Sequence, residues 1–160
     1  MDVTTFSRIR DIFLSDRPSF ALFTAAGMLG MSLAELKREI GTGAIVAVSS
    51  GVGQRVSREE LVAAAIRMWE QSVIEEALGI YAPLLLPEAI RLVELGARVP
   101  RYQRDMLRVL AERQRTSVDD VLSRELEGIA CGYAEELRKS VAGFGEAMAW
   151  PESGVAYVTA

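Results

Sequence analysis

The side chains that most often perform enzyme chemistry are scarce in this chain. It has no histidine and a single cysteine, Cys131, among 160 residues. Histidine-based acid–base catalysis, histidine metal ligation and a cysteine-based zinc site are therefore excluded. The adjacent carboxylates fall where helices are expected, and acidic residues in a first turn are favoured by the helix dipole alone. They are Asp119-Asp120, Glu59-Glu60 and Glu75-Glu76. We therefore predict no enzymatic activity, no metal and no cofactor.

Composition limits the remaining classes. Half of the residues are apolar, which is enough to bury a core without disulfides. A lone cysteine cannot form an internal disulfide, so we expect a reducing, cytoplasmic setting and a buried Cys131. No signal-peptide pattern and no stretch of membrane-spanning length is found, so no membrane partner is expected. A formal net charge of -4 argues against a strongly basic nucleic-acid binder, although it allows a local basic face.

Residues 22–61 contain the densest series of local structural signals. Ser32 and Glu35 have the spacing of a capping box, which predicts a helix over residues 33–40. Thr24 is an N-cap candidate for a shorter helix that precedes the one over residues 33–40. Gly30 lies between the two helices, where a tight turn with positive φ is easiest for glycine. Two short helices joined by such a turn predict a helix-turn-helix unit.

A hairpin and a third helix are expected next. Residues 44–48 are rich in β-branched side chains, residues 49–53 have turn composition, and residues 54–56 can return as a second strand. Ser57 and Glu60 form a second capping-box pattern. It opens a helix that we expect to run from residue 58 to about residue 78, with Gly79 ending it.

This order of elements resembles the excisionase-type, MerR-related winged helix-turn-helix family. The resemblance covers about a quarter of the chain. The matching residues are Phe23-Thr24, Leu29-Gly30-Met31-Ser32, the helix at 33–40, Gly43-Ala44-Ile45, the turn at 51–53, Arg55-Val56 and residues 57–61. The resemblance implies DNA binding, with the second helix in the major groove and the wing on the phosphate backbone.

The resemblance also implies a set of DNA-contacting residues. Lys37 and Arg38 are the cations of the second helix, on the side opposite Leu36 and Ile40. The full set is Thr24, Ser32, Leu33, Ala34, Lys37, Arg38, Gln54, Arg55 and Arg58. The alternative is a solvated face, since Glu35 and Glu39 balance the two cations.

The C-terminal half carries a second pattern. Pro100 opens a helix expected to reach about Gln114, and Ser117 with Asp120 caps another that runs towards Val141. This part resembles the ribbon-helix-helix repressors and antitoxins, in which a short strand precedes the proline. Residues 92–99 suit either that strand or a helix, and a short helix is expected over residues 88–95. A plain helical hairpin is the alternative.

Two faces of this half are candidates for partners. Small and apolar side chains on the last helix predict a dimer or partner surface of Leu122, Leu126, Gly128, Ile129, Gly132 and Tyr133. On the preceding helix, arginines recur on one side at positions 101, 104, 108 and 115. They suit phosphates or an acidic partner. Asp105 and Glu112 lie four residues from two of them, which favours self-paired charges instead.

The sequence therefore predicts a mainly α protein with four parts. These are an N-terminal amphipathic helix (1–16), a winged helix-turn-helix domain (17–79), a helical dimerisation or partner-binding region (80–142) and a loosely held tail (143–160). The expected function is a DNA-binding transcriptional regulator that forms a homodimer. An antitoxin-like autorepressor, with a cognate toxin as its partner, fits both resemblances. The alternative is a protein-interaction adaptor that does not bind DNA.

Overall fold

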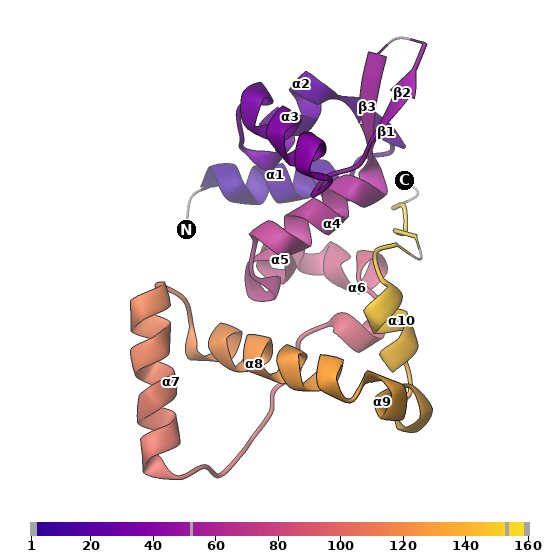
Figure 1. Cartoon of the computed structure of the whole chain (residues 1–160). Coiled ribbons are helices and arrows are strands. Elements are labelled where there is room, and N and C mark those ends of the chain that lie inside the picture. The colour runs from indigo at the N-terminus through magenta and orange to yellow at the C-terminus, as the bar shows by residue number, and fades with distance from the viewer. Residues whose placement is uncertain (1–2, 52, 153, 159–160) are drawn as a thin grey trace. The chain divides into compact units, whose positions relative to one another are not determined.

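The computed structural model describes residues 3–51, 53–152 and 154–158 (Figure 1). The chain is mainly helical, with one small antiparallel sheet of three strands. It forms two compact units. The first unit consists of residues 1–91 and 146–160, and the second of residues 92–145. Among the described residues, no helix is both long and apolar enough to cross a membrane.

The first unit contains most of the secondary structure. Its elements are α1 (Val3–Phe13), β1 (Ser19–Ala21), α2 (Leu22–Leu29), α3 (Leu33–Thr42), β2 (Ala47–Ser50), β3 (Gly53–Ser57), α4 (Arg58–Met68), α5 (Gln71–Leu78), η1 (Gly79–Tyr81), α6 (Ala82–Leu85) and η2 (Glu88–Ile90). Helix α10 (Phe144–Ala149) leads into its C-terminal segment.

Helix α1 closes the core of the first unit. Its Ile9, Ile12 and Phe13 are fully buried, as expected from the spacing of its apolar residues. The helix packs against α5, α2 and α4. The helix predicted as a separate N-terminal part therefore shares one core with the residues that follow it, which differs from the boundary expected at residue 16.

The sheet has the strand order β1-β3-β2, with both pairs antiparallel. Phe20 of β1 lies opposite Val56 of β3, and both side chains are buried. The β2–β3 hairpin agrees with the sequence-based expectation. Strand β1 does not appear in that expectation, because three residues between a proline and a helix carry too little periodicity to be recognised.

The long helix expected at residues 58–78 is two helices. α4 ends at Met68, Trp69 is extended (φ -122°, ψ 142°), and α5 begins at Gln71. This break lets α5 place Val73, Ile74, Ala77 and Leu78 in the core, where the helix packs on α1. The local sequence has no glycine or proline and favours one continuous helix, but packing against α1 has overridden that preference.

The second unit is built from α7 (Arg101–Gln114), α8 (Val118–Gly132) and α9 (Ala134–Ser140). The capping box at Ser117 and Asp120 is present, and α7 packs against α8, so the predicted helical hairpin is confirmed. The single helix expected to reach Val141 is interrupted at Tyr133 (φ -114°, ψ 20°). Residues 92–99 are neither helical nor paired as a strand, and η2 is the only helical part of residues 88–95.

The C-terminal segment belongs to the first unit. Val155 is buried in its core, and Trp150 and Val158 pack against that core. The sequence suggested a loosely held tail from residue 143, because glycines and a proline are frequent there. The structure differs from that expectation, since several apolar side chains of this segment are docked.

Candidate nucleic-acid interface

The α2–α3 pair is held by its turn and its cap. Gly30 has the left-handed conformation (φ 73°) that closes α2. Ser32 then caps α3, with its hydroxyl accepting from the Glu35 amide at 3.2 Å and its own amide donating to the Glu35 carboxylate at 2.7 Å. The predicted capping box is therefore confirmed. It fixes where α3 begins and hence which of its side chains face outward.

Helix α3 has one buried side and one exposed side. Leu36 is fully buried, and Leu33 and Ile40 are half-buried. Ala34, Lys37, Arg38 and Gly41 are exposed. The two small residues flank the two cations, so the outward surface is a low backbone ridge carrying two long basic side chains.

The acidic residues of α3 are already engaged. The hydrogen bond from the Ser32 amide is the main reason that the pKa of Glu35 lies below its usual value. The hydrogen bond with the Ser32 hydroxyl lowers the pKa further. Glu39 pairs with Arg38 at 3.5 Å. Lys37 makes no ion pair or hydrogen bond with any residue that the structure describes. The local charge of α3 is thus close to balanced, with Lys37 as its unpaired cation within the described part of the chain.

The hairpin formed by β2 and β3 lacks a freely placed cation among its described residues. Arg55 is half-buried and donates from Nε to the Ser19 hydroxyl at 2.8 Å and from Nη2 to the Ser19 carbonyl at 2.6 Å. It therefore joins β1 to β3 instead of projecting from the wing, as the predicted backbone contact would require. Gln54 is exposed on the hairpin, together with Val48.

Arg58 was predicted to contact DNA, and the structure contradicts this. Its side chain is fully buried. It donates to four backbone carbonyls and lies 4.2 Å from the centroid of the Tyr157 ring. The acceptors are Ile12 and Val155, both at 3.4 Å, Ala156 at 2.8 Å, and Phe13. The end of α1 and the docked C-terminal segment together enclose this arginine.

The other predicted DNA contacts are distributed as follows. Thr24 is exposed in the first turn of α2, whose N-cap is Ala21 and not Thr24 as expected. Ser32 is exposed, but its amide and hydroxyl belong to the capping box. The exposed residues available for contact are therefore Thr24, Ala34, Lys37, Arg38 and Gln54.

A groove of about 420 Å³ lies beside α3. Apolar side chains line it, including Met31, Ile45 and Met68. Arg38 and Glu39 contribute from α3, and Arg67 contributes from α4. Sequence reasoning gave Arg67 no role, yet it donates to the Ala44 carbonyl at 2.8 Å and pairs with Glu60 at 3.5 Å.

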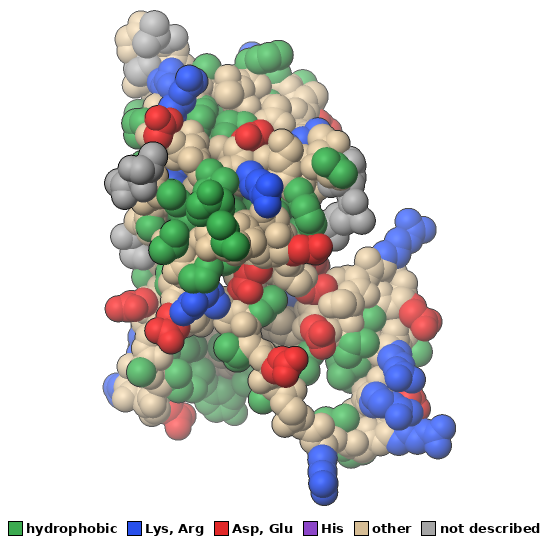
Figure 2. All heavy atoms as spheres, turned by 180° about the vertical axis from the view of Figure 1, so that it is seen from behind, with side chains coloured by type: hydrophobic (Ala, Val, Ile, Leu, Met, Phe, Trp, Pro, Cys, Tyr) green, Lys and Arg blue, Asp and Glu red, His purple; other side chains and the backbone are tan. Residues whose placement is uncertain are grey.

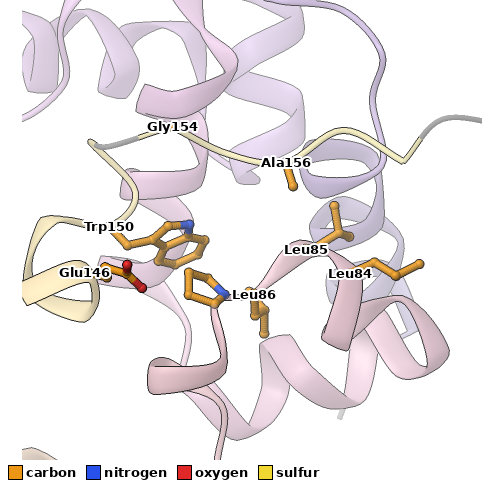
Figure 3. Close-up of a pocket in the computed structure, with 8 residues that line it drawn as sticks. Leu84, Leu85, Leu86, Glu146, Trp150, Gly154 and Ala156 are labelled. Carbon is orange, nitrogen blue, oxygen red and sulfur yellow. The ribbon is translucent and has the colours of Figure 1, made fainter. Parts of the chain in front are cut away.

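A second hollow, of about 410 Å³, lies where the C-terminal segment meets α6 (Figure 3). Trp150 and Glu146 line it from the C-terminal side, opposite residues 84–86. One exposed carboxylate in an apolar hollow provides no acid–base pair. The described residues contain no group of three or more acidic or cysteine side chains that would hold a metal.

The predicted partner surface on α8 is largely exposed. Leu126, Ile129 and Tyr133 are 43%, 56% and 60% exposed, and Leu122 is half-buried. Gly128 and Gly132 are also exposed, with open space where a Cβ would lie. Cys131 is exposed, contrary to the expectation of a buried thiol, because the second unit has few buried residues to enclose it.

This chain has no match among family models, curated proteins or solved structures. Its function is therefore inferred from its residues and their geometry.

Proposed function

We propose that this protein is a DNA-binding transcriptional regulator of the winged helix-turn-helix type. The observation that carries the proposal is the outward face of α3, where Lys37 and Arg38 lie opposite the buried Leu36. The β2–β3 hairpin follows α3 directly in the chain. An α-helix is about 10–12 Å across with its side chains, which fits the major groove of B-DNA, about 12 Å wide.

The proposed contacts divide between reading and positioning. Lys37 has no described partner to give up, whereas Arg38 exchanges its pairing with Glu39 for a phosphate or a guanine edge. Ala34 is small enough to let the helix approach the bases. Gln54 and Thr24 supply neutral donors for the phosphate backbone. Arg55 and Arg58 support the scaffold through Ser19 and the C-terminal segment.

Dimerisation through the second unit belongs to the same proposal. The exposed apolar residues Leu126, Ile129 and Tyr133 of α8 support it, because exposed apolar patches mark interaction surfaces. Two copies would present two α3 helices to two half-sites. An antitoxin-like regulator that represses its own operon is one form of this proposal, with the toxin as a further partner.

The test is a fluorescence-anisotropy titration with a duplex taken from upstream of the coding sequence, at several salt concentrations. Lys37→Ala/Arg38→Ala should weaken binding by about 1–3 kcal/mol if either residue reads a base, or lower the salt slope by about 0.9 for each phosphate it no longer neutralises. Arg138→Ala/Lys139→Ala is the matched control, since it removes two adjacent exposed cations from α9. Circular dichroism checks that each variant is folded. Equal binding by the α3 variant and the native chain would contradict the proposal.

A protein-interaction adaptor is the second candidate. The groove lined by Met31, Ile45 and Met68 beside α3 favours it, because methionine-lined surfaces adapt to varied partners. The nearly balanced charge of α3 points the same way. If the protein is an adaptor, we expect no salt-dependent binding to DNA. Its binding to a protein partner should depend little on salt, because protein contacts release few counterions.

A further inference from the structure

Helix α7 and its C-cap residue carry an arginine stripe, which we define as Arg101, Arg104, Arg108 and Arg115. All four residues are exposed. Arg101, Arg104 and Arg108 lie on one side of the helix because they are three and four residues apart, and Arg115 follows as the C-cap of the helix, in the left-handed conformation. They extend over roughly 20 Å at the helical rise of 1.5 Å per residue. Figure 2 shows basic side chains gathered along this helix.

The side of α7 that packs against α8 adjoins the stripe, since Ala111 lies seven residues after Arg104, about 20° from it around the helix. Ala111 is buried there, and Leu107 and Leu110 are half-buried. A third side carries Tyr102, Met106 and Val109, all exposed. The basic surface therefore borders the packing side and lies apart from the exposed apolar side, and its arginines stay exposed beside the buried Ala111.

The charge of the stripe is only partly neutralised. Asp105 forms ion pairs with Arg101, at 3.6 Å, and with Arg104, at 2.7 Å. Arg108 and Arg115 form no ion pair or hydrogen bond through their side chains with the residues that the structure describes. Residues 98–115 contain six of the chain's 18 basic residues and two acidic ones, Asp105 and Glu112. The surface is locally basic in a chain whose net charge is -4.

We propose that the arginine stripe binds the phosphate backbone of duplex DNA. The inference rests on the proposed function, and it supplies what the first unit lacks. Arg55 and Arg58 are occupied by Ser19 and by backbone carbonyls, and Arg38 is paired. Phosphate neutralisation supplies most of the sequence-independent affinity for DNA, so a second basic surface would add to the contacts proposed for Lys37 and Arg38.

Phosphates suit the stripe better than an acidic protein does. The cations follow one line along a rod, and a duplex offers regularly repeated charges along its length, one per 3.4 Å of each strand. Guanidinium groups also match phosphate oxygens in a two-point geometry. Because both units belong to one chain, binding by α3 raises the effective concentration of phosphates near the stripe.

The experiment compares arginines of α7 that differ in which side they occupy. Arg108→Gln removes a stripe cation, and Arg113→Gln removes an exposed cation about 140° around the same helix. Arg101→Gln/Arg108→Gln/Arg115→Asn removes three stripe cations, with asparagine chosen because Arg115 has a positive φ of 56°. Each full-length variant is titrated with the upstream duplex and with a scrambled duplex of equal length, at several salt concentrations. Circular dichroism and light scattering check its fold and mass.

The triple variant should lose affinity by the same factor on both duplexes, because phosphates carry no sequence. Its salt slope should fall by about 0.9 for each phosphate that it no longer neutralises, that is by about 2–3 in all. Arg108→Gln should lower the slope by about 0.9, and Arg113→Gln should match the native chain. An unchanged slope in the triple variant overturns the inference and leaves an acidic protein as the occupant. Equal reductions in Arg108→Gln and Arg113→Gln overturn it as well, since they indicate a general charge effect.

A parallel titration of Lys37→Ala/Arg38→Ala separates the two proposals. If only the α3 variant loses affinity, the proposed function stands and the stripe is excluded. If only the stripe variants lose affinity, the stripe binds DNA and the role of α3 is wrong. If the native chain binds neither duplex, both proposals fail.

Discussion

Replacing Arg58 with methionine should destabilise the first unit without removing a DNA contact. The native side chain is fully buried and donates to four carbonyls, two of them in the C-terminal segment. No carboxylate among the described residues pairs with it. The arginine therefore connects the start of α4 to residues 12–13 and to residues 155–157.

The magnitude follows from the strength of those interactions. The two bonds at 3.4 Å are weak. The bonds to Phe13 and Ala156 are short, and charged hydrogen bonds contribute about 1.5–3 kcal/mol each. The Tyr157 ring adds about 1 kcal/mol through its cation–π contact. Methionine recovers about 1–3 kcal/mol, because it is itself apolar and needs no desolvation of a charge. These ranges combine to a net destabilisation of about 1–6 kcal/mol.

Tryptophan fluorescence measures this destabilisation in the appropriate unit. The chain has two tryptophans, Trp69 and Trp150, and both belong to the first unit. Urea unfolding followed by their emission should show a lower midpoint for Arg58→Met. Arg58→Lys should lie between it and the native chain, because an ammonium group retains the charge but not the fork of donors.

A double-mutant cycle tests the proposed origin of the destabilisation. Deleting residues 154–160 removes Val155, Ala156 and Tyr157 from Arg58. The deletion and Arg58→Met should be strongly non-additive, because each removes the same interactions. Additive effects, or an unchanged urea midpoint in Arg58→Met, would refute the reasoning.

Two further predictions concern the cap of α3 and the second unit. Because Ser32 lowers the pKa of Glu35, the stabilisation by this cap is complete above the ordinary carboxyl pKa and is lost as the pH falls through the lowered value. An NMR titration of the Glu35 carboxyl should show a lower pKa in the native chain than in Ser32→Ala, which loses the hydroxyl but keeps the backbone amide; equal values would contradict the contribution of the hydroxyl. Light scattering at micromolar concentration should give the mass of a dimer for the native chain and of a monomer for Ile129→Glu, since a charge on the exposed apolar surface opposes its burial. A monomeric native chain would contradict dimerisation.

The parts of the fold that the sequence predicted depend on interactions between residues close in the chain. Ser32 with Glu35, and Ser117 with Asp120, satisfy backbone groups three residues away. These short-range bonds fix the starts of α3 and α8. Periodicity likewise predicted the buried side of α1. The outward position of Lys37 and Arg38 follows from the same local information.

The features that escaped prediction depend on segments far apart in the chain. Arg58 is buried because Val155 and Ala156, 97 and 98 residues later, cover it. Arg55 is engaged because strand β1 lies beside β3, although β1 has only three residues. The break between α4 and α5 serves packing on α1. Cys131 is exposed because little of the second unit surrounds it. The sequence alone determines which residues carry charge and where the capped helices α3 and α8 start, whereas burial, and thus which cations remain exposed, is decided by tertiary packing.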